Sequence, residues 1–179
     1  MKLHKITRQD DIREEFQHIF IDKDNIVATN AHILVIVPKT LFFEGQEIPE
    51  MFVRGRDWAK IYPRKNHFVK YEENHLVLYS EAKLYRGEVA RVKPILKENA
   101  GFKYPDYTKV IPNGELKEVD KIGINSYFMR LYNKATGINE IKLSFYGHGK
   151  PIVIKPFDDY YQDVKAVIMP IVLPEWIYV

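Results

Sequence analysis

Histidines and carboxylates are the residue types in this sequence that could bind a metal or transfer a proton. None of the six histidines stands in an H-x-x-x-H or H-E-x-x-H pattern, so no spacing supports a metal site. The adjacent pairs Glu72-Glu73 and Asp158-Asp159 would point to opposite faces of a strand, so neither forms an acid and base couple. There is no G-x-S-x-G or P-loop pattern, and Gly147-His148-Gly149 is typical of a hairpin turn. We therefore predict no enzyme activity, no metal and no cofactor.

The composition restricts the class of protein further. The chain has 179 residues, of which 46% are hydrophobic and 28% charged, as in ordinary folded domains, and this argues against a disordered chain or a coiled coil. It contains no cysteine, which excludes a thiol nucleophile and a disulfide scaffold. A net charge of +3 is too small to predict nucleic-acid binding from overall charge. With no signal-peptide pattern and no membrane-length apolar run, we expect a cytoplasmic protein.

Strand patterns outnumber helix patterns along the chain. A helix is expected over 54–62, and a second over 126–135, where Asn125 can cap the start and Gly137 lies just past the end. The expected strands are 16–21, 26–29, 32–37, 67–71, 76–79, 82–85, 88–93, 140–145, 151–155 and 165–173.

The order of these elements suggests an internal repeat. Two sets of a helix followed by strands come after a set of strands with no evident helix, which indicates a repeat of roughly 50 residues. Prolines and glycines gather in the segment 100–114, which is the best boundary. We therefore expect two α+β lobes, residues 1–104 and 105–179, that share a sheet or pack tightly.

Three short stretches carry a resemblance to a known family. They are Val-Ala-Thr-Asn-Ala-His-Ile-Leu at 27–34, Tyr-Pro-Asp-Tyr-Thr-Lys-Val-Ile-Pro at 104–112 and Ala-Val-Ile-Met-Pro-Ile-Val-Leu at 166–173. Taken in this order, they resemble the bacterial sliding clamp, the beta subunit of DNA polymerase III, and the second stretch is the most specific. The resemblance covers most of residues 14–173 and implies an α+β fold of repeated units, each a helix plus an antiparallel sheet.

The sequence also departs from the family pattern. Asn30-Ala31 stands where the family has Asp-Gly, and Ile33 and Val172 stand where it has arginine. The family chain is longer and contains more of these units. The chain here continues past the family's terminal stretch with an apolar tail, residues 174–179. We expect this tail to be buried, either in the chain's own groove beside Met169 and Pro105 or against a neighbouring subunit.

The resemblance implies an apolar groove for linear peptides of polymerases and other replication proteins. Aliphatic residues would supply burial, methionine would adapt to different partners, and threonine and histidine would add polar anchors. The alternative is that the same aliphatic residues are simply core. The matching positions are Thr29, His32, Leu34, Pro105, Val110, Ile168, Met169, Pro170, Ile171 and Leu173.

The resemblance also implies that basic residues on the helices face DNA. Arg130 and Lys134 are spaced i, i+4 and share one helix face. Such cations attract phosphates without reading the base sequence, although a solvated helix face explains them equally. The region of the earlier helix is also rich in basic residues, namely Arg54, Arg56, Lys60, Arg64 and Lys65.

We therefore predict a clamp-like scaffold associated with duplex DNA, of the processivity-factor type, which docks replication or repair proteins. A chain of this length cannot surround a duplex alone, so a ring would require a homo-oligomer. The alternative function is a peptide-binding adaptor derived from a clamp, with no ring and no DNA contact.

Overall fold

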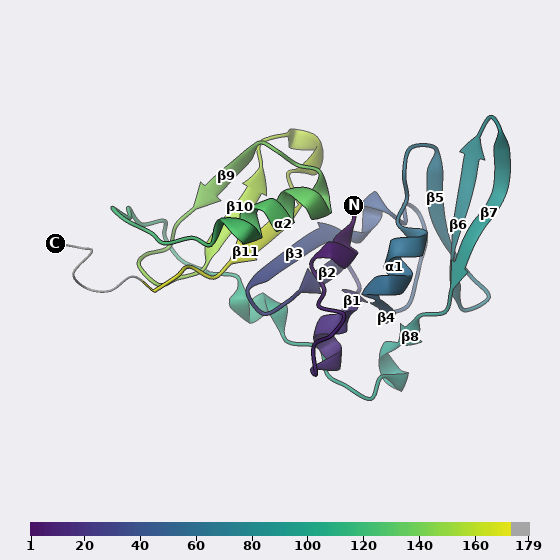
Figure 1. Cartoon of the computed structure of the whole chain (residues 1–179), viewed down its shortest axis with the longest axis horizontal. Helices are drawn as coiled ribbons and strands as arrows, with labels where there is room; N and C mark the ends of the chain where they lie inside the picture. Colours follow the sequence, from purple (N-terminus) through teal and green to yellow (C-terminus); the bar gives the residue numbers. More distant parts are fainter. Residues whose placement is uncertain (173–179) are drawn as a thin grey trace.

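The computed structural model describes residues 1–172, within which eight strands form one antiparallel sheet (Figure 1). Most of these strands are rich in β-branched residues, which favour the pleated, buried conformation. The strands, in order across the sheet, are β8 (Ile95–Leu96), β4 (Met51–Arg54), β1 (His18–Ile21), β2 (Asn25–Thr29), β3 (Ile33–Pro38), β11 (Lys165–Ile168), β10 (Ile152–Pro156) and β9 (Ile141–Ser144).

A separate three-stranded sheet is formed by β5 (His67–Glu72), β6 (His75–Ala82) and β7 (Tyr85–Val92). The sequence analysis expected one strand at 82–85 and another at 88–93, and the break between them was wrong. β6 continues to Ala82, and Gly87 pairs with Ser80 inside β7. The Ser80 hydroxyl fixes the tighter turn, because it accepts from the Ala82 N–H at 3.2 Å and donates to the Tyr85 carbonyl at 3.0 Å.

α-Helices form at both places where local sequence signals predict them. α2 (Ser126–Thr136) starts at Asn125, whose side chain accepts from the N–H of Tyr127, and ends at Gly137 with φ +80°. α1 (Gly55–Ile61) ends just before Pro63. The short 3-10 helices are η1 (Leu3–Lys5), η2 (Glu14–Gln17), η3 (Lys39–Leu41), η4 (Lys97–Asn99), η5 (Tyr107–Val110) and η6 (Asp159–Tyr161).

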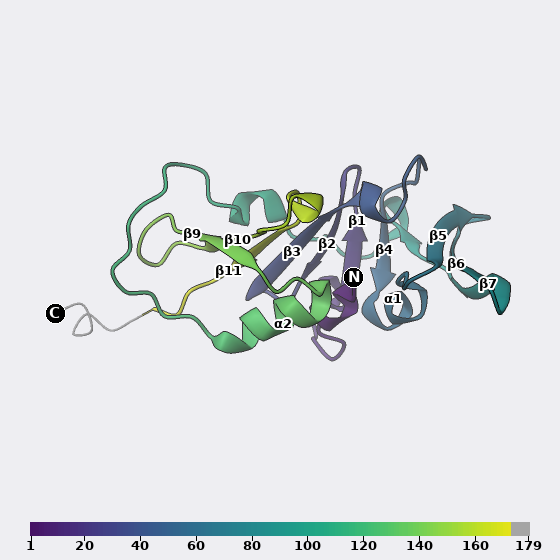
Figure 2. The same ribbon diagram turned by 90° about the horizontal axis from the view of Figure 1, so that it is seen from above.

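Both α-helices cover the same face of the large sheet (Figure 2). One buried cluster lies between the helices and that face of the sheet, and it includes Trp58 and Ile61 of α1 and Leu131 and Tyr132 of α2. A smaller aromatic and aliphatic cluster covers the opposite face. In chain order, a strand, a helix and three strands occur twice, as β4-α1-β5-β6-β7 and as β8-α2-β9-β10-β11, after the first three strands. The prediction of repeated helix-plus-antiparallel-sheet units is therefore confirmed.

The large sheet also runs across the boundary proposed at residue 104. β3, from the first part of the chain, pairs with β11 near its end, with Val35 opposite Ala166 and Leu34 opposite Val167. This pairing creates the only sheet contact between the two described halves, and it brings the first and third motif stretches side by side. The division into two lobes stays a prediction.

The N-terminal segment connects the two helices. The indole Nε1 of Trp58 in α1 donates to the Met1 carbonyl at 3.3 Å, and the Lys2 N–H donates to the Ala135 carbonyl at the end of α2 at 2.5 Å. Trp58 is 1% exposed, so its hydrogen bond is made inside the core. The segment therefore holds the ends of α1 and α2 at a fixed spacing.

His4 in this segment makes the fold sensitive to acid. Its ring packs on Tyr62 with centroids 5.4 Å apart, and its Nδ1 is buried without a hydrogen-bond partner among residues 1–172. Burial, reinforced by the neighbouring Lys5 and Lys2, lowers the pKa of His4 from 6.5 to about 4. The unfolded chain therefore binds more protons than the folded chain between these values, so stability is lost as pH falls through them.

We expect the urea midpoint to decrease as pH is lowered from 6.5 toward 4, and the variant His4→Phe to lose part of that decrease. Urea unfolding followed by far-UV circular dichroism at a series of pH values measures this. Identical pH profiles for the wild-type chain and His4→Phe would contradict it.

Among residues 1–172, no helix combines the length and the apolar character that crossing a membrane requires.

Candidate functional site

The three motif stretches meet around one small apolar cavity of about 110 Å³. The β2–β3 turn forms its floor, the segment 105–110 one wall, and the end of β11 another. We call this cavity the apolar groove. It contains no lysine, arginine, aspartate or glutamate. Its lining residues are Phe16, Thr29, Ala31, His32, Ile33, Leu34, Pro105, Tyr107, Val110, Val167 and Met169.

Side-chain hydrogen bonds shape the floor of the groove. The hydroxyl of Thr29 donates to the Ile33 carbonyl at 2.9 Å, and the Asn30 Oδ1 accepts from the N–H groups of His32 and Ile33 at 3.1 Å. Threonine and asparagine both favour such local turns. The His32 carbonyl then accepts from the N–H of Met169, which fixes the end of β11 beside the turn.

Ala31, at the tip of this turn, has the left-handed backbone conformation with φ 73°. The left-handed conformation costs an L-residue with a Cβ about 1–2 kcal/mol, whereas glycine adopts it freely. Glycine, however, loses more conformational entropy on folding. We expect Ala31→Gly to raise the free energy of unfolding by about 0.5–1 kcal/mol, measured by urea denaturation.

Ala59→Gly, inside α1, is the matched control and should act in the opposite direction, because glycine lowers helix stability. If Ala31→Gly were neutral or destabilising, the strain would not be stored at this turn.

His32 connects the groove to the helix layer. It lines the groove, and its ring stacks on Phe128 of α2 with centroids 5.4 Å apart and planes 20° apart. An exposed histidine on the floor is thus held against the helix that carries Arg130 and Lys134.

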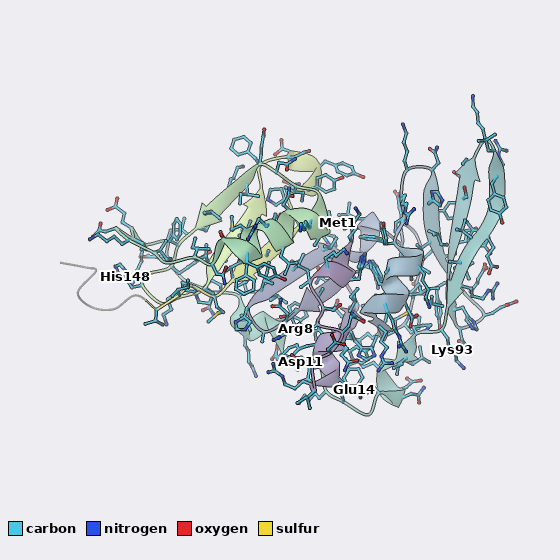
Figure 3. The ribbon with its side chains drawn as sticks, in the orientation of Figure 1. Met1, Arg8, Asp11, Glu14, Lys93 and His148 are labelled. Atoms are coloured by element: carbon cyan, nitrogen blue, oxygen red, sulfur yellow. The ribbon has the colours of Figure 1, made fainter. Side chains whose placement is uncertain are left out.

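Within residues 1–172, three predicted groove residues lie elsewhere, namely Ile168, Pro170 and Ile171. Ile168 is 1% exposed and packs in the core on the helix side of the sheet, because neighbouring residues of a strand point to opposite faces. Pro170 and Ile171 line a second hollow of about 760 Å³, where the Ile171 N–H donates to the Gly123 carbonyl at 2.8 Å. His148 borders this hollow at the end of the molecule far from β7 (Figure 3). Leu173, and the tail 174–179, lie outside the described residues.

The groove includes five residues that the sequence analysis did not assign to it: Phe16, Ala31, Ile33, Tyr107 and Val167. Val167 could have been found from strand alternation, which places it on the same face of β11 as Met169. Tyr107 stands within the Pro-Asp-Tyr stretch itself. Phe16 has no sequence signal, because η2 reaches the groove only through the tertiary fold.

The predicted basic residues all lie on or beside the two helices. Arg130 and Lys134 are exposed on α2, and Arg56 is exposed on α1. Lys60 pairs with Asp57 at 2.7 Å, so part of its charge is compensated, although such exposed pairs are weak. The guanidinium of Arg64 lies 5.2 Å from the Tyr62 ring centre.

A basic cleft of about 1020 Å³ separates the C-terminal ends of α1 and α2. It brings Arg64 and Lys134 together although they are 70 positions apart in the sequence, and it adds Lys2 and Lys5 from the N-terminal segment. No acidic residue lines it. Met1, which also lines the cleft, is seen between the two helices in Figure 3. The sequence analysis missed Lys2 and Lys5 because they belong to no predicted helix.

The described part of the chain, residues 1–172, contains no group of histidine, aspartate and glutamate side chains arranged to hold a metal ion. The small sheet carries an ion-pair cluster, in which Arg91 contacts Glu73 and Glu88 at 3.0 Å each.

Solved bacterial sliding clamps have the same fold. The beta subunit of DNA polymerase from Streptococcus pyogenes superimposes with a TM-score of 0.62 at 11% identity, covering 96% of this chain and 63% of that one. The Helicobacter pylori beta clamp bound to a DNA ligase peptide gives 0.62 at 16% identity, with 96% and 61% covered. DNA polymerase III subunit beta from Borrelia burgdorferi gives 0.63 at 14% identity, with 96% and 60% covered.

The chain therefore has a divergent sliding-clamp fold, as the three motif stretches predicted, and it spans about three fifths of the length of these clamps. No protein-family model matches the sequence, and no curated protein matches it either.

Proposed function

We propose that this chain is a sliding-clamp-like scaffold, not an enzyme, that associates with duplex DNA and docks replication or repair proteins through the apolar groove. One observation carries the docking part of this proposal. Three stretches, each separated from the next by more than 50 residues, converge on one uncharged cavity, with Val110 39% exposed and Met169 42% exposed at its edge. Exposed aliphatic side chains around a small hollow suit the burial of one apolar side chain from a linear peptide.

The helix layer supports the DNA part. The predicted basic residues lie on or beside α1 and α2, which cover one face of the sheet, and Arg64 and Lys134 share the basic cleft with Lys2 and Lys5. Cations gathered on one side of a protein bind phosphates electrostatically, with an affinity that salt reduces. The groove and the cleft are built from different residues, so one molecule has room for both ligands.

A peptide titration tests the docking function. The probe is the fluorescently labelled DNA ligase peptide of the kind bound by the Helicobacter pylori clamp, followed by anisotropy against the full chain. We expect saturable binding with a Kd of about 1 mM or tighter that changes little with salt, because the groove holds no charged side chain. A scrambled peptide is the control. Equal binding of both peptides, or none, would contradict peptide docking.

The molar mass of the chain in solution tests how DNA would be held. A homo-oligomer supports a ring around the duplex, whereas a monomer requires contact with one side of the DNA only.

A further inference from the structure

Tyr107 lies in the wall of the apolar groove, and its hydroxyl is bound to a distant part of the chain. The hydroxyl donates to the Asp22 Oδ2 at 2.5 Å and accepts from the Asn25 Nδ2 at 3.3 Å. Asp22 and Asn25 belong to the β1–β2 turn, 85 and 82 residues away in the sequence. Within residues 1–172, Tyr104 and Tyr107 are the two residues of 104–110 whose side chains make hydrogen bonds to the sheet. The side chains of Thr108 and Lys109 contact Asp106 instead.

The Asp22 carboxylate is itself held in place. Its Oδ1 accepts from the N–H groups of Asp24 at 2.8 Å and Asn25 at 2.7 Å, which forms the β1–β2 turn. Lys39 also donates to the Asp22 carbonyl at 3.3 Å. Oδ2 therefore points from a rigid turn to the tyrosine. Burial, together with the Asp22 carboxylate, raises the pKa of Tyr107, so its hydroxyl stays protonated and can donate.

The beginning and the remainder of the wall segment are anchored differently. At its start, Tyr104 is buried against Phe20 and Phe52, and its hydroxyl reaches the Val27 carbonyl at 3.3 Å. Beyond Tyr104, Pro105 is exposed, as are Thr108, Lys109 and Val110. In this exposed half, the Tyr107 ring packs against the aromatic and aliphatic cluster on this face of the sheet. The Tyr107 hydroxyl adds hydrogen bonds from the wall to the sheet, at Asp22 and Asn25.

We propose that Asp22 and Tyr107 are positioning residues that fix the wall of the apolar groove and thereby set its width. The expected effect on peptide affinity rests on the proposed docking function. The anchoring of the wall does not, because it can be measured in the free protein. Hydrogen bonds to a charged acceptor are about twice as strong as neutral ones, so losing this one should free the segment. A mobile wall must be ordered when a peptide binds, and this ordering lowers affinity.

Tyr107→Phe tests the proposal, because it removes the hydroxyl and keeps the ring. In the free chain we expect the amides of residues 106–111 to exchange with solvent about tenfold faster, while the amides of β2 and β3 keep their rates. Affinity for the labelled DNA ligase peptide should fall about tenfold, through faster dissociation. Tyr85→Phe is the matched control, because it removes a hydroxyl that donates to the Glu88 carbonyl on β7, away from the groove.

A double-mutant cycle isolates the pair. Asp22→Asn alone keeps a polar partner for the hydroxyl and should raise exchange at 106–111 less than Tyr107→Phe does. In the Tyr107→Phe background, Asp22→Asn should add no further increase at these amides. Additive effects there, or unchanged exchange in Tyr107→Phe, would overturn the proposal.

The peptide-binding measurement distinguishes failure of this proposal from failure of the docking function. A wild-type chain that binds no peptide removes the docking function, and the exchange rates still decide whether the pair anchors the segment. If the wild-type chain binds and Tyr107→Phe binds equally tightly despite faster exchange, the pair does not set the groove width, and the proposal fails.

Discussion

Replacing Arg130 and Lys134 together by glutamate is expected to lower the affinity for duplex DNA by about tenfold to a hundredfold, and to reduce the salt slope by about two. Both side chains are exposed on α2, so the exchange leaves the core beneath the helix intact. Each contact between a cation and a phosphate releases a counterion, and a glutamate at the same place repels the phosphate. Anisotropy of a labelled duplex, titrated at several salt concentrations, measures both quantities.

The matched control is the double variant Lys142→Glu and Lys155→Glu. These two lysines lie opposite each other on β9 and β10, on the sheet face away from the helices, and both are exposed. The control makes the same change in net charge, so it should leave most of the DNA affinity if the helix layer is the binding face. Equal losses in both double variants would indicate that only overall charge matters. If the wild-type chain shows no duplex binding at about 50 mM salt, DNA contact is excluded and the ring-less adaptor is favoured.

Val110→Glu is expected to weaken binding of the DNA ligase peptide by about a hundredfold, because peptide docking would bury an unpaired carboxylate in an uncharged cavity. Val110 is 39% exposed in the free chain, so the glutamate remains hydrated there and the fold should keep its stability. Anisotropy gives the affinity, and urea unfolding checks the stability.

Leu84→Glu is the control for this experiment. Leu84 is 102% exposed in the β6–β7 turn and does not line the groove. The small sheet with this turn lies at the opposite end of the molecule from β9 (Figure 1). This variant adds the same charge without touching the groove and should bind as the wild-type chain does. Unchanged peptide affinity in Val110→Glu would show that the peptide binds elsewhere.

The elements of this protein were predictable where local signals define them. α2 is the clearest example, because Asn125 satisfies an N–H group at its start and Gly137 adopts the left-handed conformation that ends it. The hairpin of β1 and β2 was likewise expected from two apolar runs around a polar turn. The β6–β7 turn was misplaced, because Gly87 is a turn residue by type but lies inside a strand here.

The sequence by itself also determined the fold class, through three stretches whose residue order resembles the sliding clamps. What it could not determine is which strands pair to form the groove and which face of the sheet the groove lies on. Leu34 and Val167 are partners across β3 and β11, and only this pairing places both on the groove side while Ile168 enters the opposite core. Strand register depends on contacts between residues more than 100 positions apart, and no local pattern encodes it.

The same reason explains the two features that sequence analysis missed. Lys2 and Lys5 join Arg64 and Lys134 in the basic cleft because the N-terminal segment is hydrogen-bonded between two helices. Tyr107 was part of a recognised motif, but its partner Asp22 is 85 residues away. Residue types and local spacing thus determined the two helices, the hairpin of β1 and β2, and the motif stretches. The groove, its anchored wall and the basic cleft depend on strand pairing and helix packing, which bring together side chains that are remote in the sequence.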